Sequence, residues 1–287
     1  MTTIAEDARQ VKVRGAGRTA LRAAYVLSAA VGGLMLAASS AGLFVEGLYP
    51  DGPWAREAFR AGDLATMALV APALIASLIM SARGSTRATL VWMGMLGYSV
   101  YNYAYYVFGA VFNDIFLLHV ALFSISIFAL VCALRGLDVD SLGGGFRSKV
   151  VARSIGMFLL VVGLAQGGLW VFVVLRFVTT GQLLEDIPVE GQHLVFALDL
   201  SLLAPTLVLA GVLLFRMRPI GFVMGTAVSV FGAGYQINLM ASGVFQANAD
   251  VPGVKAFPLE SIILTVGFVV ASVILLLAVR GARREGP

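Results

Sequence analysis

The chain has 287 residues, of which 59% are hydrophobic and only 13% are charged, and its mean hydropathy is +0.91. A soluble protein cannot bury that much apolar surface, so the composition excludes a water-soluble domain. Cys132 is the only cysteine, which excludes an intrachain disulfide and a cysteine-based zinc or iron–sulfur site.

Continuous apolar segments follow one another along the whole chain. They lie near residues 20–45, 63–82, 88–110, 114–134, 153–176, 192–215, 219–245 and 258–280. Each is continuously apolar over about 20 residues, as a transmembrane helix requires, whereas the strands of a membrane barrel alternate over about 10 residues. The sequence therefore predicts an all-α integral membrane protein with eight transmembrane helices.

Several sequence features recur at a nearly constant offset. Arg18 precedes Gly32-Gly33 by fourteen residues, as Arg153 precedes Gly167-Gly168, and Ala71-Pro72 precedes Arg83 as Ala204-Pro205 precedes Arg216. This order predicts two parallel four-helix repeats, residues 18–137 and 153–283, related by an axis along the membrane normal. The expected remainder is an N-terminal tail at 1–17, a linker at 138–152 and a C-terminal tail at 284–287.

The basic residues predict the orientation of these helices. Of the 20 lysines and arginines, all but Arg56, Arg60, Arg176 and Lys255 fall on one side of the eight-span arrangement. Basic residues in short loops stay in the cytoplasm, so both termini are expected inside. The net charge of +4 is then a consequence of topology, and no nucleic-acid partner is expected. We expect the plasma membrane of a bacterium or an archaeon.

Two features concern the packing of the helices. Ala29, Gly33, Ala37 and Ala41 recur every four residues on the first span and predict a smooth ridge against a neighbouring helix. Pro72 and Pro205 occupy equivalent places in spans two and six, where each removes a backbone donor and is expected to kink its helix.

Asp199 is the most informative polar residue within the predicted spans. It lies seven residues after Gln192 at the start of span six, which places it roughly 10 Å below the outer surface. A carboxylate there costs about 3 kcal/mol on insertion scales, so Asp199 is expected to face the protein interior in an outward-opening cavity. Thr66 occupies the equivalent position of the first repeat.

Further polar residues gather in the outer half of the membrane and are candidates for binding a small molecule together with Asp199. They are Tyr98, Tyr101, Asn102 and Tyr105 on span three, His119 on span four, Gln166 on span five, His193 on span six, and Gln236 and Asn238 on span seven. Tyrosine is also common at membrane interfaces, and amides often bond neighbouring helices for about 1 kcal/mol each, which gives a purely structural alternative. The histidines suggest a metal or heme, or an interfacial position.

The chain combines an eight-span layout with the pattern Glu-x-x-His in Glu190-Gly191-Gln192-His193, at the entrance of span six. This combination resembles the heme A synthase family, whose helices supply axial histidines to heme. The first repeat has Glu57-Ala58-Phe59-Arg60 instead, spans two and eight contain no histidine, and the loop cysteines of that family are absent.

Three classes of function follow. A small-solute or proton-coupled permease, taking a ligand from the outer side, accounts for the repeats, the matching prolines and Asp199. A membrane enzyme or heme-linked redox protein accounts for the histidines and aromatic residues, but no nucleophile arrangement or complete ligand set is present. A non-catalytic receptor or assembly subunit needs only the packing surfaces. The sequence identifies neither a cofactor nor an oligomeric state.

Overall fold

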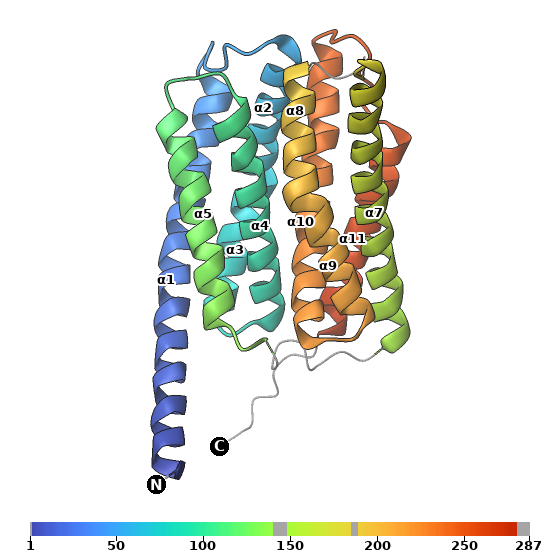
Figure 1. Cartoon of the computed structure of the whole chain (residues 1–287). Helices are drawn as coiled ribbons and strands as arrows, with labels where there is room; N and C mark the ends of the chain where they lie inside the picture. The colour runs from blue at the N-terminus through green and yellow to red at the C-terminus, as the bar shows by residue number, and fades with distance from the viewer. Residues whose placement is uncertain (1, 140–147, 185–188, 280–287) are drawn as a thin grey trace.

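The computed structural model describes residues 2–139, 148–184 and 189–279, and within these ranges it is entirely helical (Figure 1). The elements are α1 (Thr2–Phe44), α2 (Pro53–Ala65), η1 (Thr66–Val70), α3 (Ala71–Ala82), α4 (Thr86–Gly109), α5 (Phe116–Gly136), α7 (Lys149–Thr180), α8 (Val189–Leu198), η2 (Asp199–Leu203), α9 (Ala204–Phe215), α10 (Pro219–Asn248) and α11 (Leu259–Ala278). Since α2–η1–α3 and α8–η2–α9 are each continuous, the described residues form eight helical runs. Connections between them alternate between the two ends of the bundle.

Seven of these runs are long and apolar enough to cross a membrane, which confirms a helical, membrane-type fold. The run that falls short is α4, which contains five tyrosines and an asparagine between Tyr98 and Tyr106. Most of α4 is buried among other helices. A helix that is shielded from lipid on most of its surface does not need an apolar exterior, so the polar composition of α4 follows from its central position.

Local sequence sets several helix ends. The Ser85 hydroxyl accepts a hydrogen bond from the Ala88 amide at 3.3 Å and caps α4. Ser148 caps α7 in the same way through the Val151 amide at 3.4 Å, because a serine oxygen satisfies an amide that has no partner within the first turn. Gly181 ends α7 with φ at +72°, a left-handed conformation that glycine adopts without steric cost.

Both prolines that were expected to kink their helices follow a five-residue π-helical segment. Pro72 follows η1, in which the Ala71 amide bonds the carbonyl of Thr66, and Pro205 follows η2, in which the Ala204 amide bonds the carbonyl of Asp199. Proline lacks an amide hydrogen and its ring displaces the carbonyl four residues before it, so a wider turn relieves the conflict. Asp199 is the first residue of η2.

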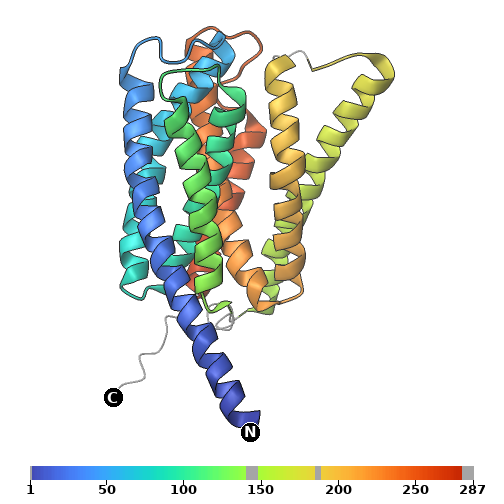
Figure 2. The same cartoon turned by 60° about the vertical axis from the view of Figure 1, so that its left-hand side comes forward.

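Helix α10 forms the centre of the bundle because it packs against α2, α4, α9 and α11. Close approach depends on small residues: a Cβ at Gly94 of α4 would lie 2.7 Å from the carbonyl oxygen of Ala227 on α10. Helix α7 stands at the edge. It packs along α9, and it diverges from α8 toward the end that carries residues 181–184 (Figure 2).

The small-residue ridge on the first span is not a packing surface, so that prediction was wrong. Ala29, Gly33 and Ala37 are exposed, and a Cβ on Gly33 would meet nothing within 4 Å. The buried side of α1 carries Val31, Met35 and other residues. Small residues can face lipid as readily as a neighbouring helix, and the sequence alone did not separate the two.

The predicted domain boundaries fall partly outside the described residues. Helix α1 already begins at Thr2, so the expected tail at 1–17 continues into the first span. Residues 140–147 of the expected linker and the expected C-terminal tail at 284–287 lie outside the described residues.

Candidate functional site

Asp199 lies in the interior of the bundle, with 1% of its surface exposed. Its Oδ2 accepts hydrogen bonds from Gln166 Nε2 at 2.6 Å and from Trp170 Nε1 at 2.7 Å, both on α7. Its Oδ1 accepts a hydrogen bond from the Tyr101 hydroxyl on α4. The carboxylate therefore faces away from lipid, as its cost of insertion required, and it joins three helices at one point.

All three donors to Asp199 are neutral. Hydrogen bonds to a charged group stabilise by about 1.5–3 kcal/mol each, which together offset the cost of a carboxylate in the membrane, about 3 kcal/mol. They leave its negative charge uncompensated, however. The ion pairs between described residues both involve a different acid, Glu57.

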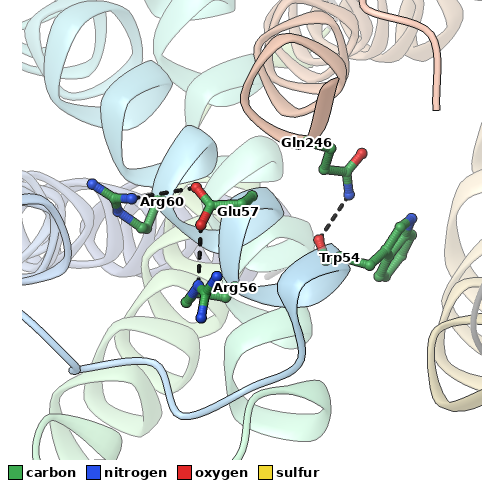
Figure 3. A network of polar contacts seen from close by, with 5 residues as sticks. All are labelled: Trp54, Arg56, Glu57, Arg60 and Gln246. Atoms are coloured by element: carbon green, nitrogen blue, oxygen red, sulfur yellow. Dashed lines mark hydrogen bonds and ion pairs between the residues drawn. The ribbon is translucent and has the colours of Figure 1, made fainter. Parts of the chain in front are cut away.

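Glu57 is a buried carboxylate whose charge is compensated by two arginines. Its Oε1 accepts a hydrogen bond from Arg56 Nε at 3.0 Å, and its Oε2 accepts one from Arg60 Nη1 at 3.3 Å (Figure 3). Beside it, Gln246 Nε2 of α10 donates to the carbonyl of Trp54 on α2 at 2.8 Å. The Gln246 bond ties the end of α10 to the start of α2.

Tyrosines extend the site from Asp199 toward α10. The hydroxyl of Tyr105 lies 3.2 Å from that of Tyr101 and 3.5 Å from that of Tyr235. The rings of Tyr101 and Tyr235 meet edge to face with centroids 5.0 Å apart. Since Tyr101 and Tyr105 are one helical turn apart on α4, they present both hydroxyls to the same side.

The predicted amides of α4 and α10 gather at the contact between these two helices and, unlike Gln166 on α7, do not reach Asp199 directly. Asn238 Nδ2 donates to Asn102 Oδ1 at 3.2 Å. Gln236 is buried and its Oε1 has no partner among the described residues. Tyr98 is also fully buried, and its hydroxyl is unpaired there. Of the predicted site residues, only Tyr101 and Gln166 touch the Asp199 carboxylate.

The two histidines occupy separate environments. His119 on α5 is fully buried, with its ring centroid 4.7 Å from that of Tyr106, whereas His193 on α8 is exposed. The side chain of Glu190 lies outside the described residues. A heme needs an open face beside its axial histidine, and the rings of Tyr103 and Tyr106 occupy that space at His119. His119 therefore lacks the open face that a heme ligand needs.

The sequence did not reveal a second buried carboxylate, Asp63 on α2. It is 1% exposed, and its Oδ2 accepts a hydrogen bond from the Tyr49 hydroxyl at 2.7 Å. The Tyr106 hydroxyl donates to its Oδ1 at 3.2 Å. The predicted second span began at residue 63, whereas the helix begins ten residues earlier, at Pro53. The polar start of α2 concealed that part of the span.

Trp170 was also missed, because a tryptophan on an apolar helix is typical of the membrane interface. Its indole instead packs at a tilt against Phe196, with centroids 4.6 Å apart, and points its N–H at Asp199. A surface pocket of about 350 Å³ lies elsewhere, between the start of α2 and the end of α10. Its lining includes Glu57, Arg60 and Asn248 but neither Asp199 nor its partners.

Comparison of the chain with known protein families, with curated proteins and with solved structures gives no match. The functional inference therefore depends on the residues of this chain. Its basis is a buried carboxylate in a membrane-type bundle, held by neutral donors from two other helices, at the first residue of a π-helical segment.

Proposed function

We propose that the protein is a proton-coupled permease for a small solute, with Asp199 as the proton-binding group. The observation that carries this proposal is that Asp199 is buried and bonded only to the neutral side chains of Tyr101, Gln166 and Trp170. An uncompensated carboxylate in a membrane interior takes up a proton or a cation more readily than one held by arginine.

Proton binding would change the contacts between helices. The ionised carboxylate accepts all three bonds, whereas a protonated carboxyl has a hydroxyl that must itself donate. One donor is then displaced. Gln166 and Trp170 are the side chains that attach α7 to η2 through Asp199, so protonation would weaken this attachment. Helix α7 already diverges from α8 beyond this point (Figure 2).

The π-helical segment supports movement at the same place. A π turn leaves backbone carbonyls less regularly bonded than an α turn, and such turns are frequent at functional sites. In η2 the exposed Ser201 hydroxyl bonds the carbonyl of Ala197 at 2.5 Å. A helix with its proton-binding residue at such a segment can adjust its direction at low cost.

The orientation and the internal repeat belong to the same proposal. Both termini are inside, α4 crosses the membrane as the eighth span, and residues 18–137 and 153–283 are related by duplication. The paired segments η1 and η2 support the duplication, because each is followed by a helix that begins with Ala-Pro and ends at an arginine cap. Parallel repeats of this kind place a site between the halves, where Tyr101 of the first half meets Asp199 of the second.

A thermal-stability screen tests the proposal. Small polar solutes are added to the purified protein at an acidic and an alkaline pH, since a ligand that binds the folded state raises the melting temperature. A solute coupled to the proton stabilises the wild type to different extents at the two pH values. Asp199→Asn should abolish that difference. If a solute still raises the melting temperature of a folded Asp199→Asn protein to different extents at the two pH values, the proposed role of Asp199 is contradicted.

A further inference from the structure

The surroundings of Asp63 contain several polar groups that make no hydrogen bond of regular geometry among the described residues. The side chains of Ser39, Thr66, Tyr98, Tyr103 and His119 are all buried to at least 99%, and each has an unbonded nitrogen or oxygen. Leaving a buried polar group unpaired costs about 1–3 kcal/mol. Such groups in a folded protein are commonly satisfied by ordered water.

These groups surround one carboxylate and are not scattered. Tyr98 is within reach of a long side-chain hydrogen bond with Thr66, as Tyr103 is with Ser39, and both tyrosines lie within electrostatic reach of Asp63. The ring of His119 packs at a tilt against that of Tyr106, which itself donates to Asp63. Helices α1, α2, α4 and α5 thus each direct polar groups toward a common region of the first half.

No basic side chain is paired with Asp63 within the described residues. Its bonded neighbours are Tyr49 and Tyr106, and Tyr98 and Tyr103 are further titratable groups within electrostatic reach of it. His119 lies behind Tyr106, against its ring. Asp51 lies farther away, beyond Tyr49. In the loop before α2, burial and the neighbouring Asp63 raise the pKa of the Tyr49 phenol, so Tyr49 stays protonated as a donor.

From this geometry we infer that Asp63 is a second proton-binding carboxyl group and that the unpaired groups around it hold ordered water through which the proton arrives and leaves. The inference goes beyond the proposed function, because it stands whether or not Asp199 couples a proton to transport. Asp63 and Asp199 each lie ten residues after the first residue of their helical run. Both are therefore roughly 15 Å along the helix from its outer end.

Infrared spectroscopy of the purified protein in lipid tests the inference, because a protonated carboxylic acid has a carbonyl stretch that an ionised one lacks. Spectra are recorded across a pH titration for the wild type, Asp63→Asn, Asp199→Asn and the double variant. Because the other acidic side chains contribute equally to both spectra, we expect the difference between Asp199→Asn and the double variant to contain a carboxylic-acid band that titrates. If this difference contains no such band at any pH, Asp63 binds no proton and the inference is wrong.

A glycine substitution provides a second test in case Asp63→Asn does not fold. A Cβ at Gly42 of α1 would collide with Asp63 Oδ2, and it would lie 2.8 Å from the Tyr49 hydroxyl. Gly42→Ala should therefore shift the frequency of the Asp63 band. Gly33→Ala on the same helix, where a Cβ meets nothing within 4 Å, should leave the band unchanged. If the band has the same frequency in both variants, its assignment to Asp63 is contradicted.

The water is tested in the same Asp199→Asn protein with ¹⁸O-labelled water. Water O–H stretching bands that change together with the Asp63 titration are expected to shift with the isotope and to disappear in the double variant. If no such isotope-sensitive bands are found, the part of the inference that concerns ordered water is wrong. A titration of sodium chloride at constant pH distinguishes a metal cation: if sodium eliminates the Asp63 band with a saturable dependence, the site binds a cation and the proton assignment fails.

Discussion

At the level of single residues, the buried carboxylates differ in what compensates them. Glu57 has two arginines, whereas Asp63 and Asp199 have only neutral donors. The sequence indicated Asp199 because it lies well inside an apolar segment. It did not indicate Asp63, because Arg56, Glu57 and Arg60 made the start of that helix resemble a loop. Partners such as Trp170 depend on tertiary contacts that local sequence does not specify.

Trp170→Phe tests the hydrogen bond to Asp199 while keeping an aromatic ring against Phe196. We expect a loss of about 1.5–3 kcal/mol in the free energy of unfolding when Asp199 is ionised, because the lost bond is to a charge. The loss should diminish at low pH, where the carboxyl is protonated and no longer needs all its donors. Denaturant unfolding in detergent at several pH values measures it.

Trp92→Phe is the matched control. Trp92 Nε1 donates to the neutral Ser28 hydroxyl at 2.9 Å, so its removal should cost only about 0.5–1.5 kcal/mol. Neither partner titrates, and the cost should not depend on pH. A pH-independent loss in Trp170→Phe, equal to that of Trp92→Phe, would show that Asp199 does not change its charge over the range studied.

At the level of helices, the sequence predicted the number and approximate positions of the runs, because about 20 consecutive apolar residues leave few alternatives. It did not predict which faces are buried. The exposed Gly33 and the tightly packed Gly94 are both glycines within apolar helices, yet only Gly94 touches a neighbouring backbone. The π-helical form of the irregularities at Pro72 and Pro205 was also beyond the sequence, since proline indicates only that the regular bonding changes.

Gly94→Ala tests the contact between α4 and α10. Its Cβ would lie 2.7 Å from both the Ala227 carbonyl oxygen and the Val230 Cβ, so the helices must separate. We expect a destabilisation of about 1–3 kcal/mol, as overpacking usually causes. Gly97→Ala, three residues further along α4, meets nothing within 4 Å and should be neutral or slightly stabilising. Thermal unfolding in detergent compares the two, and equal melting temperatures would argue against this interface.

At the level of the whole molecule, apolar composition established a helical membrane-type protein, and the structure confirms it with seven sufficiently apolar runs. Orientation remains a prediction from the distribution of arginine and lysine. The sequence also did not show that the two buried aspartates have different surroundings in the two halves of the chain. Asp63 is enclosed by elements of the first half, whereas Asp199 is reached by Tyr101 across the contact between the halves.

Cysteine labelling from outside the cell tests the orientation in a Cys132→Ala background. Single cysteines at Gly52 and Ala249, which are exposed at one end of the bundle, should react with a membrane-impermeant reagent. Cysteines at the exposed positions Arg83 and Arg216, at the other end, should react only after the membrane is permeabilised. The opposite pattern would place the termini outside and reverse the side from which Asp199 is reached.

The most direct test of the central claim measures proton movement in proteoliposomes that contain an internal pH indicator. A solute identified by its pH-dependent stabilisation is added outside, and the indicator follows protons that enter with it. The wild type should show a solute-dependent internal acidification. Asp199→Asn should show none while still exchanging labelled solute across the membrane at equal concentrations. Solute entry without any acidification in the wild type, or acidification that is unchanged in Asp199→Asn, would contradict a proton-coupled permease that operates through Asp199.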